Sequence, residues 1–396
     1  MLLRIGFLCF VICFLLPYKT IFSESIPTKI RVGILSKYTP KEIEIRSWDA
    51  KVIAGKRFIE KKNSTLRLKA NANRIVVHHE SKNFSEEFIG FLGGSYEISF
   101  PIRKDVFRYS GDLEITSIKG KLVLILSIPK NEYTRIATES EFGTLFHTNP
   151  QNITAPNWKK EFKSAAETVV LSYALANLNR HKSEGYDLCD LTHCLQYSGR
   201  TDRKSKVQEE DSSLFILKDS NGNILEAFFH SACGGNLTRP SVMWKNHKSQ
   251  ENMFRSGKDL WKTNRILCET SPHFRWENVI HRIDLEKALE LKKITQLQTI
   301  QKESRVTEVL VKTENGNSSI PVALFLSKIG KGLGWNQIKS NDFNIENSRN
   351  GFLIQGKGFG HGVGLCQYGA REMAFQGATS AEILKFYFPN ARLAKL

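Results

Sequence analysis

Hydrophobic and polar residues alternate in short runs along the first third of the chain. From Lys29 to about Ile128, runs such as "KIRVGIL", "TLRLKA", "YEISFPI" and "KLVLILSI" are separated by Gly, Asn, Ser and Lys. Alternation with a period of two places the apolar side chains on one face of a strand. The pattern therefore predicts a β-rich N-terminal region.

The period lengthens to three or four residues between Asn157 and His181, which predicts an amphipathic helix with Asn157 as its N-cap. Strands are expected again at "SLFILKD" and "ILEAFFHSA", which the Asn-Gly pair between them would join as a hairpin. Two more strands are expected at "RVTEVLVKT" and "IPVALFLSK", and a helix after Asp284. Near the C-terminus a short helix is expected at "REMAFQG", and Thr379 with Glu382 forms a capping box.

The mixed order of these elements predicts the α+β class, with a β-rich N-terminal region followed by a mixed domain. A length of 396 residues and 41% apolar content are typical of a folded protein of more than one domain. We divide the chain into a segment 1–24, a β-rich domain 25–104 and a mixed domain 105–396.

The segment 1–24 resembles a secretory signal, because Arg4 is followed by an apolar run from Ile5 to Pro17 and then by small and polar residues. We expect export to the periplasm or cell envelope. The apolar run is shorter than the roughly 20 residues of a membrane span, which favours a signal over its alternative, an uncleaved membrane anchor. Removing residues 1–24 lowers the net charge only from +17 to +16. Such a basic exported protein favours anionic envelope polymers or lipid headgroups as partners, rather than nucleic acid.

The stretch "GKGFGHGVGLCQYGA" begins at Gly356 and has glycine at every second position through Gly364. In an extended segment this spacing would leave one face bare and place His361 on the other. A bare face needs a close neighbour, either a ligand or another part of the backbone. The spacing fits neither G-x-G-x-x-G nor a P-loop, so we do not expect a nucleotide.

A second stretch, "HKSEGYDLCDLTHC", places His181, Cys189, His193 and Cys194 within fourteen residues. Two histidines and two cysteines match a tetrahedral zinc set, although the spacing is not that of a zinc finger. There are two alternatives: Cys189 and Cys194 form a disulfide, or the four residues form neither a zinc site nor a disulfide.

The exported part holds an odd number of cysteines, so at least one is not paired with another. Cys233 and Cys268 could pair in an oxidising compartment, and Cys366 would then be the remaining thiol. A small buried thiol is the simplest interpretation of Cys366.

Glu139 and Glu141 stand two apart in "EYTRIATESEF" and would share a face if that segment were extended. Either could act as a general acid, and either could be an ordinary solvated side chain. Composition and spacing alone do not choose between these interpretations.

With these stretches in view, the chain resembles the SpoIID/LytB family of bacterial cell-wall proteins over roughly residues 105–396. The resemblance is carried, in order along the chain, by "FRYSGDLEI", "EYTRIATESEF", "SYALANLNRHKSEGYDLCDLTHCLQYSG", "FFHSACGGNLT", "SPHFRW", "GKGFGHGVGLCQYGAREMA" and "EILKFYFPNARL". SpoIID members are lytic transglycosylases, which cleave peptidoglycan glycan without water and leave a 1,6-anhydro end on the muramic acid. LytB members modify a cell-wall amidase.

The resemblance implies a role for each stretch. Glu141, eight residues after Tyr133, corresponds to the catalytic glutamate, and Glu139 is the weaker candidate. The cluster His181, Cys189, His193 and Cys194 corresponds to a zinc site of some members, which as a closed four-ligand set would be structural. The glycine stretch would line a groove for the glycan; the implied substrate-binding residues are Gly360, His361, Gly362, Gln367 and Tyr368.

The chain also departs from the family pattern. Phe142 and Gly143 follow Glu141 where Met-Pro is usual, and Ala166 and Leu171 replace a glutamine and an arginine of the helix. The polar segment 143–160 is longer than expected. Two other functions therefore stay open: a non-catalytic peptidoglycan-binding partner of a cell-wall amidase, and a structural envelope protein.

Overall fold

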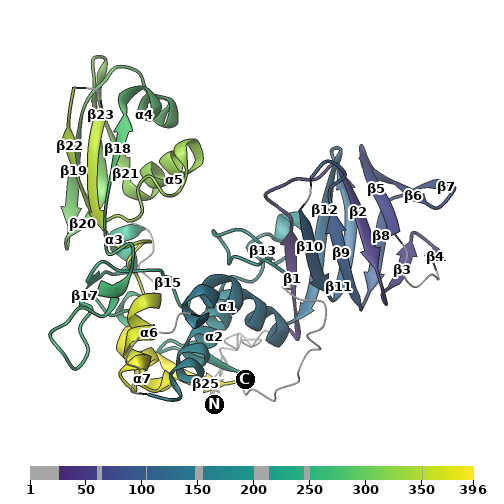
Figure 1. Ribbon diagram of the computed structural model, residues 1–396, viewed down its shortest axis with the longest axis horizontal. Helices are drawn as coiled ribbons and strands as arrows, with labels where there is room; N and C mark the ends of the chain where they lie inside the picture. The colour runs from purple at the N-terminus through teal and green to yellow at the C-terminus, as the bar shows by residue number, and fades with distance from the viewer. Residues whose placement is uncertain are drawn as a thin grey trace, which may run out of the picture.

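The structure is a computed structural model that describes residues 26–59, 65–103, 105–147, 155–199, 214–244, 250–349 and 351–396. The predicted signal segment 1–24 and most of the residues between the first two helices lie outside these ranges. Among the described residues, no helix combines the length and the apolar character needed to cross a bilayer. Figure 1 shows three parts: a β-rich unit, a central group of helices and a smaller α/β lobe.

Two antiparallel sheets form the β-rich unit. One has the strand order β13-β1-β12-β11-β8-β3-β4 and the other β10-β9-β2-β5-β6-β7, β13 being the one parallel neighbour among these ordered pairs. Alternate side chains, such as those of Leu66 and Leu68, are fully buried in the shared core. The strands are β1 (Lys29–Ile34), β2 (Glu42–Ser47), β3 (Lys51–Ala54), β4 (Arg57–Ile59), β5 (Thr65–Asn71), β6 (Arg74–His79), β7 (Lys82–Glu86), β8 (Phe88–Leu92), β9 (Ser95–Ser99), β10 (Val106–Ser110), β11 (Asp112–Ile118), β12 (Lys121–Pro129) and β13 (Leu188–Cys189).

The alternation seen in the sequence is confirmed by these strands, but the unit does not end at residue 104. Strand β10 pairs with β9, β11 with β8, and β12 with β1. Because each of these strands completes a sheet begun earlier in the chain, the β-rich unit extends to Pro129.

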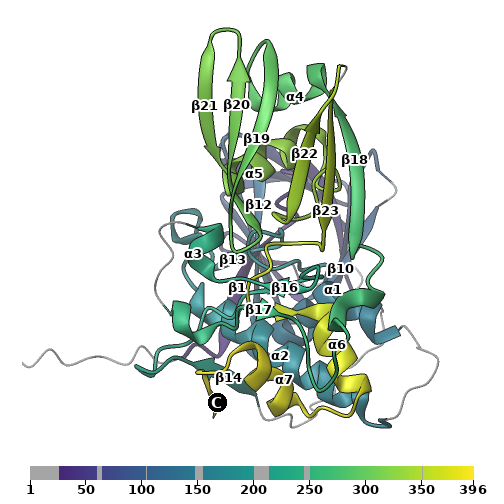
Figure 2. The ribbon, with the colours of Figure 1, turned by 90° about the vertical axis from the view of Figure 1, so that its left-hand side faces the viewer.

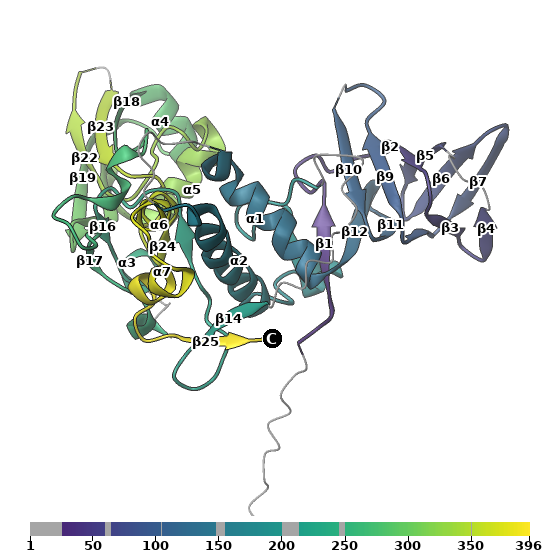
Figure 3. The same cartoon turned by 60° about the horizontal axis from the view of Figure 1, so that its bottom comes forward.

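The central part is built around two long helices, α1 (Lys130–His147) and α2 (Trp158–Ala176), which lie side by side (Figure 3). Helix α1 follows β12 directly and is not predicted by the sequence, in which Glu139 and Glu141 would share a face only if their segment were extended. The apolar residues Tyr133, Ile136 and Ala137 instead recur at helical spacing and are buried. Helix α2 was predicted at this position, although the side chain of Asn157 makes no capping bond.

Short elements join and cover these helices. The predicted hairpin is only a local turn with a bridge from Lys218 to Ile224, because β14 pairs with the C-terminal β25 and β15 pairs in parallel with β24. The capping box of Thr379 and Glu382 is confirmed at the start of α7. The elements are η1 (Lys182–Glu184), β14 (Phe215–Lys218), β15 (Phe229–His230), β16 (Asn236–Leu237), α3 (Pro240–Met243), η2 (Glu251–Met253), β17 (Gly257–Lys258), η3 (Leu267–Thr270), β24 (Leu365–Cys366), α6 (Gln367–Phe375), α7 (Ser380–Tyr387) and β25 (Arg392–Lys395).

The third part is an α/β lobe with its own apolar core, and it stands above the central helices in Figure 2. Its sheets have the orders β18-β23-β22 and β19-β20-β21. The segment "IPVALFLSK", expected as a strand, is mostly helix α5, because Val322, Phe325 and Ile329 are spaced to bury one helical face. The elements are β18 (Arg275–His281), α4 (Arg282–Leu289), β19 (Ile294–Lys302), β20 (Arg305–Thr313), β21 (Gly316–Pro321), α5 (Val322–Leu333), β22 (Phe343–Asn347) and β23 (Gly351–Lys357). The α+β class is confirmed.

Candidate active site

A cavity of about 660 Å³ lies where α1, the end of α2, the His/Cys-rich loop and the glycine stretch meet. Both charged and aromatic side chains face it, as in many sites that bind polar ligands. Its lining residues are Glu141, Tyr173, Arg180, Thr192, His193, Cys194, Leu195, Glu226, Phe228, Phe229, His230, Trp244, Gly360 and His361.

Glu141 projects into this cavity from the second half of α1. One carboxylate oxygen accepts a hydrogen bond from the backbone N–H of Gln196 at 2.6 Å. Burial raises the pKa of the carboxyl to about 7, and the bond from Gln196 opposes this rise. At neutral pH the protonated and ionised forms are therefore both populated, as a group that first gives and then takes a proton requires.

Glu139 lies elsewhere on α1, since two helical positions differ by about 200° around the axis. Its exposed side chain pairs with His147 at 3.2 Å, and it is not among the residues lining the cavity. Of the two predicted candidates, only Glu141 has the surroundings of an acid–base group.

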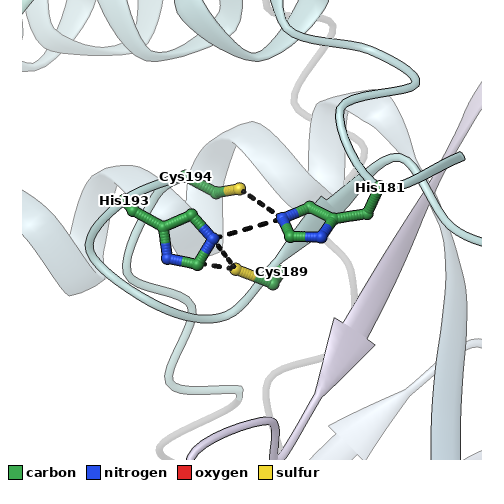
Figure 4. A group of neighbouring side chains, drawn as sticks. All are labelled: His181, Cys189, His193 and Cys194. Carbon is green, nitrogen blue, oxygen red and sulfur yellow. Dashed lines mark hydrogen bonds between the residues drawn. The ribbon is translucent and has the colours of Figure 1, made fainter. Parts of the chain in front are cut away.

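The four predicted metal ligands converge on one point, as Figure 4 shows, and two of them line this cavity. Their ligand atoms all lie within 4.8 Å of one another. Cys194 Sγ is 3.3 Å from His181 Nε2, and Cys189 Sγ is 3.3 Å from His193 Nε2. Both cysteines are free thiols, so the alternative disulfide is not formed.

The donor set fits zinc, because two thiols and two imidazoles supply four ligands at a spacing that one ion can bridge. His181 Nδ1 bonds to Glu184 Oε1 at 2.8 Å, which turns Nε2 toward the other donors. Hydrogen bonds, first from Cys189 and also from His181, lower the pKa of Cys194 to about 5, so a thiolate forms readily. His193 and Cys194 also line the cavity that holds Glu141.

The glycine stretch is not an extended strand with one bare face. After β23 ends at Lys357 the chain turns repeatedly, with positive φ at Gly360 and Gly364. A Cβ at Gly360 would meet the side chain of His230, and one at Gly364 would meet the backbone oxygen of Phe228. The close neighbour is therefore the protein's own β15 segment, so the glycines at these positions serve internal packing.

Only Gly360 and His361 of the predicted substrate-binding residues line the cavity. A Cβ at Gly362 would meet the guanidinium of Arg305. Gln367 is buried and its amide donates to the backbone oxygen of Glu141 at 3.3 Å, so it positions α1 instead. Tyr368 bonds through its backbone N–H to Ser231 and packs against Arg371.

The imidazole of His361 is neutral at pH 7. Burial, and then the charge of Arg305, lower its pKa to about 4. Its Nδ1 accepts from the N–H of Val363 at 3.1 Å. The ring packs with Trp244 at a centroid distance of 5.1 Å, and Trp244 stacks on Phe228 at 4.9 Å. Together these three rings form an aromatic wall of the cavity.

Sequence reasoning missed His230, which stands in the quoted stretch "FFHSACGGNLT". Its Nδ1 lies 3.0 Å from the backbone oxygen of Val363, and a carbonyl partner requires that Nδ1 carry the proton. Its buried Nε2 has no hydrogen-bond partner among the described residues. Burial holds the pKa of His230 well below its usual value, so the ring is neutral and Nε2 carries no proton.

Tyr173, Arg180 and Glu226 were also missed as lining residues. Arg180 donates to the Tyr173 hydroxyl at 3.1 Å. Burial raises the pKa of Tyr173 to about 12, so its hydroxyl stays protonated. The carboxylate of Glu226 is close enough for its charge to act on Arg180. No spacing in the sequence distinguishes these three from surface residues, because they come from separate elements.

Ala166 and Leu171, the two departures on α2, are buried in the core and do not line the cavity. Leu171 packs with Leu175 and Ile216. These replacements therefore leave the polar groups of the cavity untouched.

Comparison with known proteins gives matches to several relatives, whereas no protein-family model matches the chain. An uncharacterized protein of Brachyspira hyodysenteriae is 24% identical over 291 residues, which are 71% of each chain. The amidase enhancer of Bacillus subtilis is 29% identical over 163 residues, 40% of this chain and 22% of that protein. Stage II sporulation protein D of Bacillus subtilis is 36% identical over 58 residues, 15% of this chain and 17% of that protein.

Proposed function

Its named relatives support a SpoIID/LytB-like, cell-wall-related family for this chain, and from this premise we propose that it is an exported peptidoglycan lytic transglycosylase. It would cleave the glycan strand between N-acetylmuramic acid and N-acetylglucosamine and leave 1,6-anhydromuramic ends. The observation that carries the proposal is Glu141, a partly buried carboxyl with a pKa of about 7 in a cavity that is open to a polar ligand.

The proposed chemistry needs one proton carrier. Protonated Glu141 donates its proton to the glycosidic oxygen as the bond from C1 of the muramic residue breaks. The resulting carboxylate takes the proton of the C6 hydroxyl while that oxygen bonds to C1 and closes the anhydro ring. The glutamate ends protonated as it began, so no water is consumed and no external base is required.

The cavity walls suit a glycan. The aromatic wall of Phe228, Trp244 and His361 offers a flat apolar surface against which a sugar ring can pack. Arg180 can donate to a hydroxyl or carbonyl oxygen of the sugar. These contacts would hold the scissile bond beside Glu141 and supply the positioning part of the rate enhancement.

In this proposal His181, Cys189, His193 and Cys194 hold a zinc ion. With all four positions of a tetrahedral ion filled, it would brace the loop and carry no reacting group. His193 and Cys194 would then be fixed as part of the cavity wall. Export would place the protein in the periplasm or cell envelope, with residues 1–24 as signal or membrane anchor.

The test is mass spectrometry of the products after the protein is incubated with peptidoglycan glycan, both peptide-free and intact. Glu141→Gln keeps the size of the side chain, and Glu139→Gln is the matched control on the same helix. We expect anhydro ends from the unaltered protein and the control. Glu141→Gln should lower the rate about 10²- to 10⁴-fold, as expected for loss of a general acid.

A second function is favoured by the length of the match to the amidase enhancer, which covers 40% of this chain. In that case the protein would bind peptidoglycan and act on a cell-wall amidase without cleaving glycan itself. Absence of anhydro ends from either substrate, together with a stimulated amidase rate that Glu141→Gln leaves unchanged, would replace the first proposal by this one.

A further inference from the structure

Three cysteines and an aspartate meet in the interior, apart from the histidine–cysteine cluster already described. Cys233 follows β15, Asp259 follows β17, Cys268 lies in η3 and Cys366 ends β24. All four residues are fully buried. Their sulfur and carboxylate oxygen atoms lie within 4.8 Å of one another.

The distances in this group match a single tetrahedral ion. Cys233 Sγ lies 3.5 Å from Cys268 Sγ and 3.1 Å from Asp259 Oδ2. Zinc–sulfur bonds of 2.3 Å at tetrahedral angles place two sulfur ligands roughly 3.8 Å apart. The three cysteines are free thiols in the structure, so the Cys233–Cys268 disulfide that the sequence allows is not formed.

The surroundings of Asp259 are those of a metal ligand rather than of a carboxylate in a salt bridge with a lysine or arginine. The hydroxyl of Tyr387 lies 3.2 Å from Oδ1, while Oδ2 faces the thiols. A Cβ at Gly369 of α6 would meet both Tyr387 and Asp259, so the helix leaves this space to the carboxylate. A buried carboxylate needs a counter-charge, and a metal ion held by neighbouring thiolates can provide one.

The negative charge of such a site has compensation nearby. The buried guanidinium of Arg305 donates to the backbone oxygen of Cys233 at 2.6 Å and to Asn341 at 3.1 Å. The backbone N–H of Gly235 points at Cys233 Sγ at 3.4 Å, and that of Cys233 points at Cys366 Sγ at 3.3 Å. Backbone N–H groups directed at sulfur stabilise thiolates.

We propose that Cys233, Asp259, Cys268 and Cys366 form a second, structural zinc site. Three thiolates favour a soft ion such as Zn²⁺, and the four side chains fill its coordination sphere. Binding displaces the thiol protons and involves no electron transfer.

The site would tie together segments that are distant in the sequence. Strands β15 and β24 pair at His230 and Cys366, and the glycine stretch with His361 lies between β23 and β24. A metal at this point fixes β15 and β24 to the loop that contains Asp259 and Cys268. It thereby supports the cavity wall from behind, whatever reaction takes place in the cavity.

The experiment measures the number of zinc ions per chain by inductively coupled plasma mass spectrometry, in protein purified under oxygen-free conditions. We expect about two zinc ions in the unaltered chain, about one in Cys268→Ser and about one in Cys194→Ser, which removes a ligand of the first cluster. A single zinc that is lost in Cys194→Ser and kept in Cys268→Ser would overturn the proposal.

Two further measurements do not depend on Cys268→Ser folding normally. Cobalt bound to Cys194→Ser protein should show the stronger sulfur-to-metal charge-transfer absorption of three thiolates, compared with two in the first cluster. Peptide mapping of the unaltered protein should recover Cys233, Cys268 and Cys366 as thiols that alkylate only after metal removal. A disulfide-linked pair among these three in the native protein would also overturn the proposal.

Discussion

Replacing Glu141 by glutamine should make the protein more stable, and only above about pH 4.5. Glu141 has an ordinary pKa of 4.5 and a pKa of about 7 in the folded protein. Between these values the folded state holds a proton that the unfolded state has released. Folding stability from this group is therefore highest below pH 4.5, falls as the pH rises to 7, and stays low above it.

The size of the effect follows from the difference between the two pKa values. Each pH unit is worth about 1.4 kcal/mol, so an ionised Glu141 costs the folded protein up to ~3 kcal/mol at pH 8. A neutral glutamine avoids this cost, and its amide oxygen can still accept from the N–H of Gln196. A zinc ion in the nearby histidine–cysteine cluster would change the pKa of Glu141 little, because two thiolates cancel the charge of Zn²⁺.

The assay is urea unfolding of the unaltered protein and of Glu141→Gln at pH 4.5, 6 and 8. The variant should match the unaltered protein at pH 4.5 and exceed it by roughly 2–3 kcal/mol at pH 8. Other groups that titrate in this range contribute equally to both proteins, so their contribution cancels in the difference. Glu139→Gln, at an exposed position on the same helix, is the matched control for the substitution itself. A difference that stays constant from pH 4.5 to 8 would refute the assigned environment of Glu141.

Three other predictions follow from the same geometry. The value of kcat/KM for glycan cleavage, measured as the release of anhydro ends, should fall about tenfold per pH unit above pH 7, because ionised Glu141 cannot protonate the leaving oxygen. A rate of release that rises with pH would contradict this prediction. Gly364→Ala should destabilise the protein by ~3 kcal/mol or more in urea unfolding, since its Cβ would meet the backbone of Phe228. Gly377→Ala, also at positive φ but with open space around it, should cost only about 1–2 kcal/mol; equal costs would show that packing does not matter at Gly364. Cys194→Ser should lose one zinc ion and lower Tm by several degrees in calorimetry, whereas an unchanged Tm would remove the bracing role of that cluster.

Local patterns predicted the elements whose stability is local. The alternating runs up to Ile128 became strands, and the capping box of Thr379 and Glu382 was found at the start of α7. Helix α1 was missed because threonines, glutamates and Gly143 interrupt its apolar spacing, and it is held by packing against α2 and against β1 and β12. The segment of α5 was taken for a strand because a short apolar run fits either period.

The candidate site divides in the same way. Resemblance to a family selected Glu141, whereas spacing together with the resemblance selected the cluster His181, Cys189, His193 and Cys194. The structure places Glu141, His193 and Cys194 in the wall of one cavity and brings the four members of the cluster together. Neither spacing nor the resemblance could select His230, whose role depends on contact with a segment 133 positions later in the chain. The aromatic wall also combines residues from three separate segments.

By itself, the sequence determined four features: the strand-rich N-terminal part, the long helix α2, the capped last helix and the His/Cys group within fourteen residues. Short-range periodicity and spacing are sufficient to predict each of them. Only the tertiary structure decided that Glu141 is partly buried while Glu139 is exposed, that the glycines turn and pack against β15, and that Cys233, Asp259, Cys268 and Cys366 meet. Burial, pKa and metal geometry depend on distances between segments that the chain brings together only when its core closes.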